Sequence, residues 1–155
     1  MSITAVIFDL DGVIISTDEY HYLAWKKIFD GERIPFNRAV NERLRGVSRL
    51  ESLEIGLEKA SRKYGAEEKS KLADNKNSYY RELLSSLSDK DILPGVIEGI
   101  DWLKRMRIKT AVASSSKNAR FILGKIGLEN YFDAVVDGTE TVSYTHLTLP
   151  TSLRV

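Results

Sequence analysis

The chain has 155 residues, of which 43% are hydrophobic and 29% charged, and its formal net charge is +1 at pH 7. This length allows one hydrophobic core with a small inserted module, and the near-neutral charge argues against nucleic acid or a membrane surface as a partner. The chain contains no cysteine, which excludes disulfides and thiolate metal sites, and its N-terminus has no signal-peptide pattern. We expect a cytoplasmic, monomeric protein.

The first segment with a clear pattern is Ile3 to Phe8, which is apolar and β-branched and predicts a buried strand of a parallel sheet. Asp9, Asp11 and Gly12 follow at the strand exit, where ligands bind in such sheets. At positions i and i+2 of an extended chain, the two carboxylates point the same way. One could then attack phosphorus while the other handles a proton. The alternative is a loop cap without a catalytic role.

The next part of the sequence predicts helices without an intervening strand, which suggests a bundle-like cap inserted into the core. Gly31 is expected to end the first helix, and Gly65 to close the third. Ser48 and Glu51 form a capping box at the start of the third helix. The expected helices cover residues 18–30, 37–45, 48–64 and 66–87.

After Pro94 and Gly95, the sequence predicts alternating helices and strands up to residue 136. The short turns between them imply right-handed parallel crossovers, so the predicted fold class is α/β with a parallel-sheet core. The core is expected to comprise residues 1–17 and 88–141, and the helical cap residues 18–87. The expected elements are a helix over 96–107, a strand over 108–113, a helix over 118–126 and a strand over 134–136.

A second polar segment, ASSSKN at residues 113–118, leaves the strand over 108–113 and begins the following helix. Hydroxyls and free backbone N–H groups at a helix start form a ready anion site, although a plain N-cap is the alternative. Because this segment and Asp9 both lie at the carboxyl ends of predicted parallel strands, we expect them to surround one phosphoryl group.

The string DLDGV at residues 9–13 resembles the nucleophile motif of the haloacid dehalogenase (HAD) superfamily. Members of this superfamily mostly transfer phosphoryl groups through an aspartyl phosphate. The resemblance implies a HAD-like, Rossmannoid core. Ser114 matches the hydroxyl-bearing residue of the second superfamily motif, which implies that it binds phosphate.

Three further strings resemble the β-phosphoglucomutase family over nearly all of residues 1–141. They are TxxYHxxxW at 17–25, LxGVSRxxSL at 44–53 and SSKN at 115–118. The resemblance implies small-molecule sugar phosphates as partners and Mg²⁺ as cofactor. It also implies interconversion of β-glucose 1-phosphate and glucose 6-phosphate through glucose 1,6-bisphosphate, under a cap that closes over the sugar.

The same resemblance implies residue roles. Asp9 is the nucleophile and Asp11 the general acid/base, and both residues hold Mg²⁺. Arg49 would bind the distal, non-transferring phosphate, and Thr17 would be a hinge. The further substrate contacts that it implies are His21, Trp25, Gly46, Val47, Ser48, Ser52, Lys76, Ser114, Ser115, Ser116, Lys117 and Asn118.

Four of these residues also have simpler interpretations. Arg49 could be an exposed charge, although a cation is unfavourable in the first turn of a helix and so indicates an anionic partner. Trp25 suits a core as well as a pocket lining. His21 could be a surface or hinge residue, while its nearness to the Asp11 turn suits steering of the acid/base. Lys76 lies in a charged helix, where lysines are usually solvated.

From about Val142 the sequence departs from the family pattern. The segment from Val142 to Thr151 resembles the translation of a transposon-end sequencing adapter, and we expect residues 142–155, His146 included, to be non-native. A divergent natural terminus is the alternative.

Under that interpretation, the family's later lysine and acidic metal loop are missing. We therefore expect this truncated chain to be inactive, although the resemblance implies that its full-length parent is a mutase. Two other functions stay open: a sugar-phosphate phosphatase of the same superfamily, and a non-catalytic fragment that binds phosphosugars.

Overall fold

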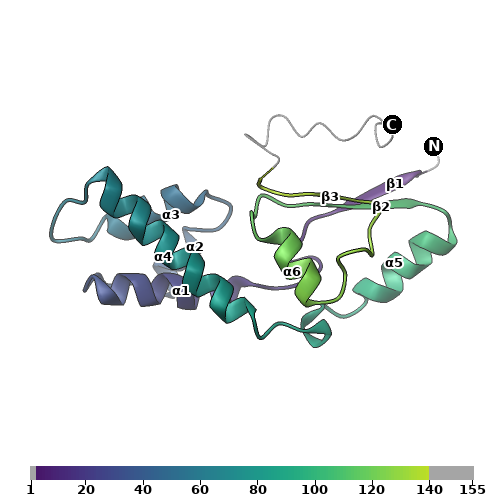
Figure 1. The fold of residues 1–155 in the computed structure, drawn as a ribbon, viewed down its shortest axis with the longest axis horizontal. Coiled ribbons are helices and arrows are strands. Elements are labelled where there is room, and N and C mark those ends of the chain that lie inside the picture. The colour runs from purple at the N-terminus through teal and green to yellow at the C-terminus, as the bar shows by residue number, and fades with distance from the viewer. Residues whose placement is uncertain (1–2, 140–155) are drawn as a thin grey trace. The chain divides into compact units, whose positions relative to one another are not determined.

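The computed structural model describes residues 3–139, and the chain divides into two compact units (Figure 1). One unit, here called the helical unit, is Asp18–Ser86; the other, the sheet unit, combines the segment that ends at Thr17 with the segment that begins at Leu87. The segment expected to be non-native, 142–155, lies outside the described residues.

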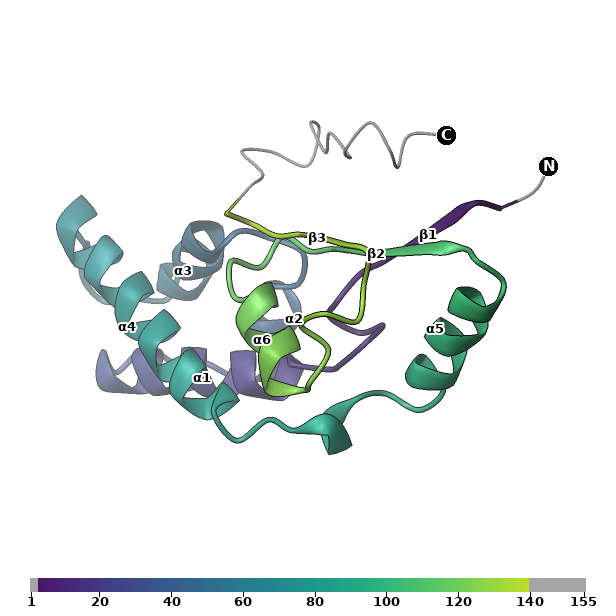
Figure 2. The ribbon, with the colours of Figure 1, turned by 45° about the vertical axis from the view of Figure 1, so that its right-hand side comes forward.

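The sheet unit contains a parallel sheet with the strand order β1-β2-β3. Two helices, α5 and α6, lie on the same side of this sheet (Figure 2), and a 3-10 turn, η1, precedes α5. The α/β class with a parallel sheet, predicted from the sequence, is confirmed. The elements are β1 (Ala5–Phe8), η1 (Asp89–Asp91), α5 (Val96–Arg105), β2 (Lys109–Ala113), α6 (Ala119–Lys125) and β3 (Ala134–Val136).

The first strand is not the buried strand that its apolar sequence predicts. Ile3 is 69% exposed and Ile7 45% exposed, whereas Val112 in β2 is fully buried. The difference arises because β1 is at the edge of the sheet and, within the described residues, α5 and α6 cover one face only. Apolar composition predicted the strand correctly, but it did not predict how many faces are covered.

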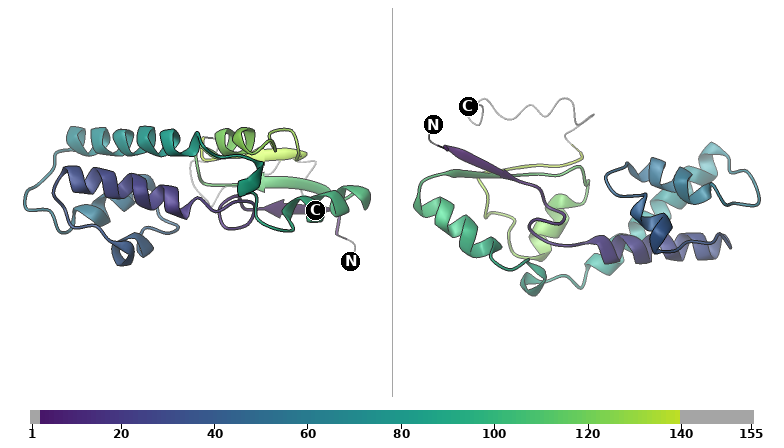
Figure 3. Two further views of the ribbon diagram at one scale, coloured as in Figure 1. Left: turned by 90° about the horizontal axis from the view of Figure 1, so that it is seen from below. Right: turned by 180° about the vertical axis from the view of Figure 1, so that it is seen from behind.

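The helical unit is built on α4, against which α1 and α3 both pack (Figure 3). Its core is aromatic: the ring of Phe29 lies 5.3 Å from that of Trp25 and 4.9 Å from that of Phe36, between centroids. None of the helices within residues 3–139 combines the length and apolarity needed to cross a bilayer. The helices are α1 (Asp18–Gly31), α2 (Arg38–Glu42), α3 (Arg49–Leu57) and α4 (Ala66–Leu84).

The predicted capping box at the start of α3 is confirmed. The N–H of Ser48 donates to the Glu51 carboxylate at 2.8 Å, and the N–H of Glu51 donates to the Ser48 hydroxyl at 3.3 Å. The predicted helix over 37–45 is shorter than expected: Asn37 caps it by accepting from the N–H of Val40, and the chain turns after Glu42.

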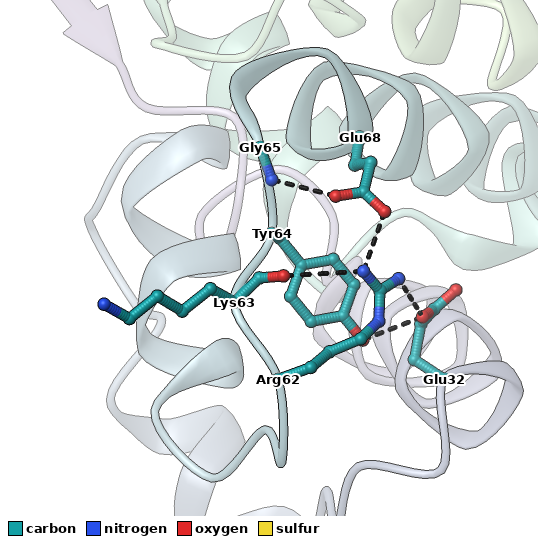
Figure 4. A network of polar contacts seen from close by, with 6 residues as sticks. All are labelled: Glu32, Arg62, Lys63, Tyr64, Gly65 and Glu68. Atoms are coloured by element: carbon teal, nitrogen blue, oxygen red, sulfur yellow. Dashed lines mark hydrogen bonds and ion pairs between the residues drawn. The ribbon is translucent and has the colours of Figure 1, made fainter.

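The third helix ends at Leu57, well before its predicted end at Tyr64, because a network of polar contacts fixes the following loop (Figure 4). Arg62 pairs with Glu68 at 2.7 Å and with Glu32 at 3.3 Å, and its guanidinium stacks on the ring of Tyr64. The Tyr64 hydroxyl donates to Glu32 at 2.8 Å.

Gly65 also has a different role from the one expected. It precedes α4 as its N-cap, and its N–H donates to the Glu68 carboxylate at 2.9 Å. Its φ of −73° is not the left-handed conformation that a closing glycine adopts. The prediction that Gly65 closes the third helix is therefore wrong: this glycine starts the next one.

The packing of α3 on α1 depends on the absence of a side chain at Gly56, where a Cβ atom would lie 1.9 Å from the buried Phe29 ring. We expect Gly56→Ala to lower the free energy of unfolding by about 1 to 3 kcal/mol, as overpacking of a core does. Gly99→Ala in α5 is the matched control, since a Cβ there meets nothing within 4 Å.

For the control, we expect a gain of about 0.5 to 1 kcal/mol, because alanine is the better helix former. Urea unfolding of both variants measures the difference. Equal free energies for Gly56→Ala and the wild-type chain would contradict the described packing.

Candidate active site

The loops that leave the three strands meet at one edge of the sheet, because the strands are parallel and their last residues are paired side by side. Asp9 follows β1, Ser114 follows β2 and Asp137 follows β3. Ligands of open parallel sheets bind at this carboxyl edge. The structure therefore brings the Asp9 and Ser114 segments to the same edge, as the sequence predicted.

The loop after β1 presents two carboxylates in different surroundings. Asp9 is exposed, and one of its carboxylate oxygens accepts a hydrogen bond from the N–H of Leu10 at 2.7 Å. Asp11 is partly buried and accepts from the hydroxyl of the buried Thr17. Gly12 has a φ of +79°, which permits the tight turn that follows Asp11. One exposed carboxylate beside one anchored carboxylate is an arrangement that suits phosphoryl transfer through an aspartate.

In the loop after β2, two serine hydroxyls accept hydrogen bonds from backbone N–H groups of the same loop. The hydroxyl of Ser114 accepts from the N–H of Ser116, and the hydroxyl of Ser116 accepts from the N–H of Asn118, both at 3.2 Å. Within residues 3–139, the N–H groups of Ser115 and Lys117 donate to no other group. The prediction of a run of free N–H groups is thus corrected to these two donors, which lie beside the Ser114 hydroxyl.

The loop after β3 contains a buried carboxylate that the sequence analysis missed. Asp137 is 2% exposed; one of its oxygens pairs with Nε of Arg120 at 3.3 Å, and the other accepts from the N–H of Thr139 at 2.9 Å. Arg120 also donates to the carbonyl of Val135 at 2.7 Å. These bonds tie the loop after β3 to α6. The available signal was the Asp-Gly pair at residues 137–138, because residues 11–12 show the same pair shortly after the first strand.

Gly138 joins the loops after β2 and β3. Its N–H donates to the carbonyl of Ser116 at 3.3 Å, and a Cβ atom at this position would lie 2.1 Å from the carbonyl oxygen of Ser115. Only glycine allows such a close approach of two backbones. The positions of the Ser115 carbonyl and of the Lys117 N–H, which would lie 3.1 Å from that Cβ atom, therefore depend on Gly138.

In the helical unit, Lys76 is not the solvated lysine that its charged helix suggested. It is 3% exposed, and its ammonium lies 2.8 Å from Nδ1 of His21. An ammonium can only donate, so Nδ1 is the acceptor and His21 is neutral with its proton on Nε2. Burial, followed by the charges of Lys76 and Arg49, lowers the pKa of His21 to about 3.

Arg49 occupies the first position of α3, where the helix dipole opposes a cation. Its guanidinium donates to the side-chain carbonyl of Asn77 in α4 at 2.8 Å, and burial lowers its pKa. Asn77 directly follows Lys76 in α4, so this bond holds Arg49 near the Lys76 and His21 pair. Ser52, one turn further along α3, is buried as well.

Of the other residues predicted to contact substrate, some are buried in the helical unit and others are exposed. Trp25 belongs to the core of the helical unit, stacked on Phe29, which agrees with its simpler interpretation; a role in lining a pocket stays a prediction. Gly46, Val47 and Ser48 are exposed, and the Ser48 hydroxyl is engaged in capping α3.

Within residues 3–139, no three His, Cys, Asp or Glu side chains cluster as a metal site. The donors after β1 still suit Mg²⁺, which proteins often hold through one or two carboxylates together with phosphate oxygens and water. Asp9 and Asp11 supply such hard oxygen donors.

Comparison with known proteins gives a consistent result. A family model described as haloacid dehalogenase-like hydrolase matches residues 3–147. The β-phosphoglucomutase of Bacillus subtilis is 50% identical over 137 residues, which cover 87% of this chain and 61% of that protein. A phosphorylated carbohydrates phosphatase of Thermotoga maritima is 32% identical over 139 residues, 88% of this chain and 62% of that protein.

Among solved structures, the β-phosphoglucomutase of Clostridium difficile has a TM-score of 0.83 and 39% identity, covering 92% of this chain and 65% of that one. The chain spans about three fifths of the length of the curated relatives it matches. The family match runs past Val142, so the foreign origin of residues 142–155 stays a prediction.

The contact between Gly138 and Ser115 can be tested by adding a methyl group. We expect Gly138→Ala to lower the free energy of unfolding by about 1 to 3 kcal/mol and to shift the amide resonances of Ser115 and Lys117. The control is Gly124→Ala in α6, where the nearest atom to a Cβ is at an ordinary 3.8 Å. Unchanged amide resonances in Gly138→Ala would show that the two loops are not in contact.

The neutral His21 makes stability depend on pH. Its pKa is lowered to about 3 in the folded chain, so between the ordinary value of 6.5 and 3 the unfolded chain binds a proton that the folded chain does not. Stability should therefore fall as the pH drops from 7 to 5, by up to about 1.4 kcal/mol per pH unit below 6.5.

We would compare urea unfolding of the wild-type chain and His21→Gln at pH 7 and pH 5. The account expects a smaller loss in the variant, because glutamine has no proton to gain. An equal loss in both chains would mean that His21 titrates normally in the fold.

Proposed function

The chain belongs to the haloacid dehalogenase-like hydrolase family, and on that premise we propose that it carries the nucleophile and sugar-phosphate residues of a β-phosphoglucomutase. The proposed reaction interconverts β-glucose 1-phosphate and glucose 6-phosphate. The main support is the carboxyl edge of the sheet, where an exposed Asp9, an anchored Asp11 and the Ser114 loop come together. The 50% identity to a β-phosphoglucomutase supports it further.

In the proposed cycle, phosphorylated Asp9 gives its phosphoryl group to a hydroxyl of the sugar monophosphate, and Asp11 takes the proton of that hydroxyl. Glucose 1,6-bisphosphate forms and then presents its other phosphate. Asp9 attacks this phosphorus, the bond from phosphorus to the sugar oxygen breaks, and Asp11 returns the proton to the oxygen that leaves. The hydroxyl of Thr17 holds the carboxylate of Asp11 for both steps.

The loop after β2 would stabilise the charge on the transferring group. The N–H groups of Ser115 and Lys117, with the hydroxyl of Ser114, are preorganised donors, and such donors lower the barrier without reorganising during the reaction. Bound Mg²⁺ would neutralise part of the same negative charge, held by the Asp9 carboxylate and the backbone carbonyl of Asp11.

The helical unit would bind the phosphate that does not react. Arg49 and Lys76 are partly or fully buried cations whose charges reach the same imidazole. Keeping cations out of water is costly unless an anion joins them. A sugar phosphate supplies that anion, with the buried Ser52 as a further contact.

The second candidate is a sugar-phosphate phosphatase, which the 32% identity to a phosphorylated carbohydrates phosphatase favours. The same Asp9 and Asp11 would serve, with water in place of the sugar hydroxyl as the acceptor. The products separate the two functions: a phosphatase releases inorganic phosphate, and a mutase releases an isomer.

To test the proposal, residues 1–141 would be joined to the part of the Bacillus subtilis relative that follows its matched region. We expect this completed chain to convert β-glucose 1-phosphate to glucose 6-phosphate with Mg²⁺ and a bisphosphate primer. Asp9→Asn should abolish turnover, because an amide is a poor nucleophile. The 155-residue chain itself serves as the comparison, and we expect little turnover from it. Phosphate release without isomerisation in the completed chain would favour the phosphatase.

The division of work between the two units can be tested at Arg49. In the completed chain, we expect Arg49→Ala to lower kcat/KM for sugar phosphate by about 10- to 100-fold, which corresponds to the loss of a charge-assisted hydrogen bond. Phosphorylation of Asp9 by acetyl phosphate should change little, since that donor has no distal phosphate.

The matched control is Arg43→Ala, which removes an exposed arginine paired with Glu58. We expect its kcat/KM to equal that of the unaltered chain. If Arg49→Ala impaired both activities equally, the assignment of Arg49 to the distal phosphate would be wrong.

A further inference from the structure

Tyr80 is a buried residue of α4 to which the sequence analysis assigned no role. It is 1% exposed and is one of the largest fully buried side chains of the described residues. It lies four residues after Lys76, so the two side chains share one face of the helix. Its ring therefore lies where it can contact the same groups as the Lys76 ammonium.

The ring of Tyr80 contacts both members of the His21 and Lys76 pair. Its centroid lies 4.1 Å from that of the His21 imidazole, with 32° between the ring planes. The ammonium of Lys76 lies 4.4 Å from the same centroid. Trp25 is a second aromatic neighbour of the ammonium, at 5.2 Å.

This arrangement has two physical effects. An aromatic ring within about 6 Å attracts a cation, more strongly when water is excluded, so the Tyr80 ring stabilises the buried ammonium. The same ring packs against the imidazole and contributes to its burial, and burial disfavours the charged form of His21. Among residues 3–139, the charges of Lys76 from α4 and Arg49 from α3 act on His21, and the titratable Tyr80 of α4 contacts it through its ring.

We propose that Tyr80 is a positioning residue whose ring holds the neutral His21 imidazole and the Lys76 ammonium in one fixed arrangement, so that Lys76 is presented to the distal phosphate of the substrate. The presentation to phosphate rests on the proposed function. The arrangement of the three side chains does not, and it can be measured without activity.

The first test follows His21 by NMR in the 155-residue chain. The chain has two histidines, and His146→Gln identifies the resonances of His21. In the wild-type chain we expect no titration of His21 between pH 8 and pH 5, and nuclear Overhauser contacts between its ring protons and those of Tyr80. Absence of these contacts would overturn the proposal without any variant of Tyr80.

Substitutions then separate the ring from the hydroxyl. Tyr80→Phe keeps the ring and should leave His21 neutral over this range. Tyr80→Leu removes the ring, and His21 should then titrate within the range, its pKa moving toward 6.5. Tyr79→Leu is the matched control, because the ring of Tyr79 contacts Lys27 instead. If His21 behaved alike in Tyr80→Leu and Tyr79→Leu, Tyr80 would be ordinary core packing.

The second test uses the completed chain. We expect Tyr80→Leu to raise KM for glucose 6-phosphate about tenfold while kcat changes little, and Tyr80→Phe to restore the original KM. A fall in kcat with an unchanged KM would overturn the role in substrate binding. If the unaltered completed chain had no activity on sugar phosphates, the proposed function would fail, and the His21 titration would still decide the role of Tyr80.

Discussion

Parallel pairing of β1, β2 and β3 is the constraint on which the chemistry of the sheet unit depends. It places three strand exits at one edge, but parallel strands alone do not fix how the loops beyond them are oriented. The close approach of Gly138 to the Ser115 carbonyl does so. The Arg120 and Asp137 pair ties the same loop to α6. The backbone donors beside Ser114 are thereby fixed without a ligand, and under the proposed function this is the condition for electrostatic preorganisation.

In the helical unit, the notable feature is a pair of cations, Lys76 and Arg49, that are wholly or partly removed from water. A neutral imidazole and an aromatic ring contact the Lys76 ammonium, and an amide oxygen accepts from Arg49. These partners offset part of the desolvation cost while leaving positive charge for a phosphate. Functional sites commonly lower the stability of a protein locally. The low pKa of His21 is the property by which this cost can be measured here.

Local patterns in the sequence were sufficient to predict the positions of the strands, the capping box at Ser48, and the location of the Asp9 and Ser114 segments at one sheet edge. Each of these features depends on neighbouring residues or on parallel topology. Local patterns failed where tertiary contacts decide. The third helix ends early because Arg62 contacts Glu32, thirty residues away. At Gly65, the sequence alone does not distinguish the start of a helix from its end, because glycine occurs at both. The close approach at Gly138 and the burial of Lys76 depend on elements far apart in the sequence, which periodicity does not report.

The central claim is that Asp9, rather than Asp11, forms the covalent bond to phosphorus. The most direct measurement is to treat the completed chain with acetyl phosphate and Mg²⁺, reduce the acyl phosphate with borohydride, and locate the modified residue by mass spectrometry. The account predicts modification at Asp9, none at Asp11, and none in Asp9→Asn. Modification at Asp11, or an equal yield in Asp9→Asn, would contradict it.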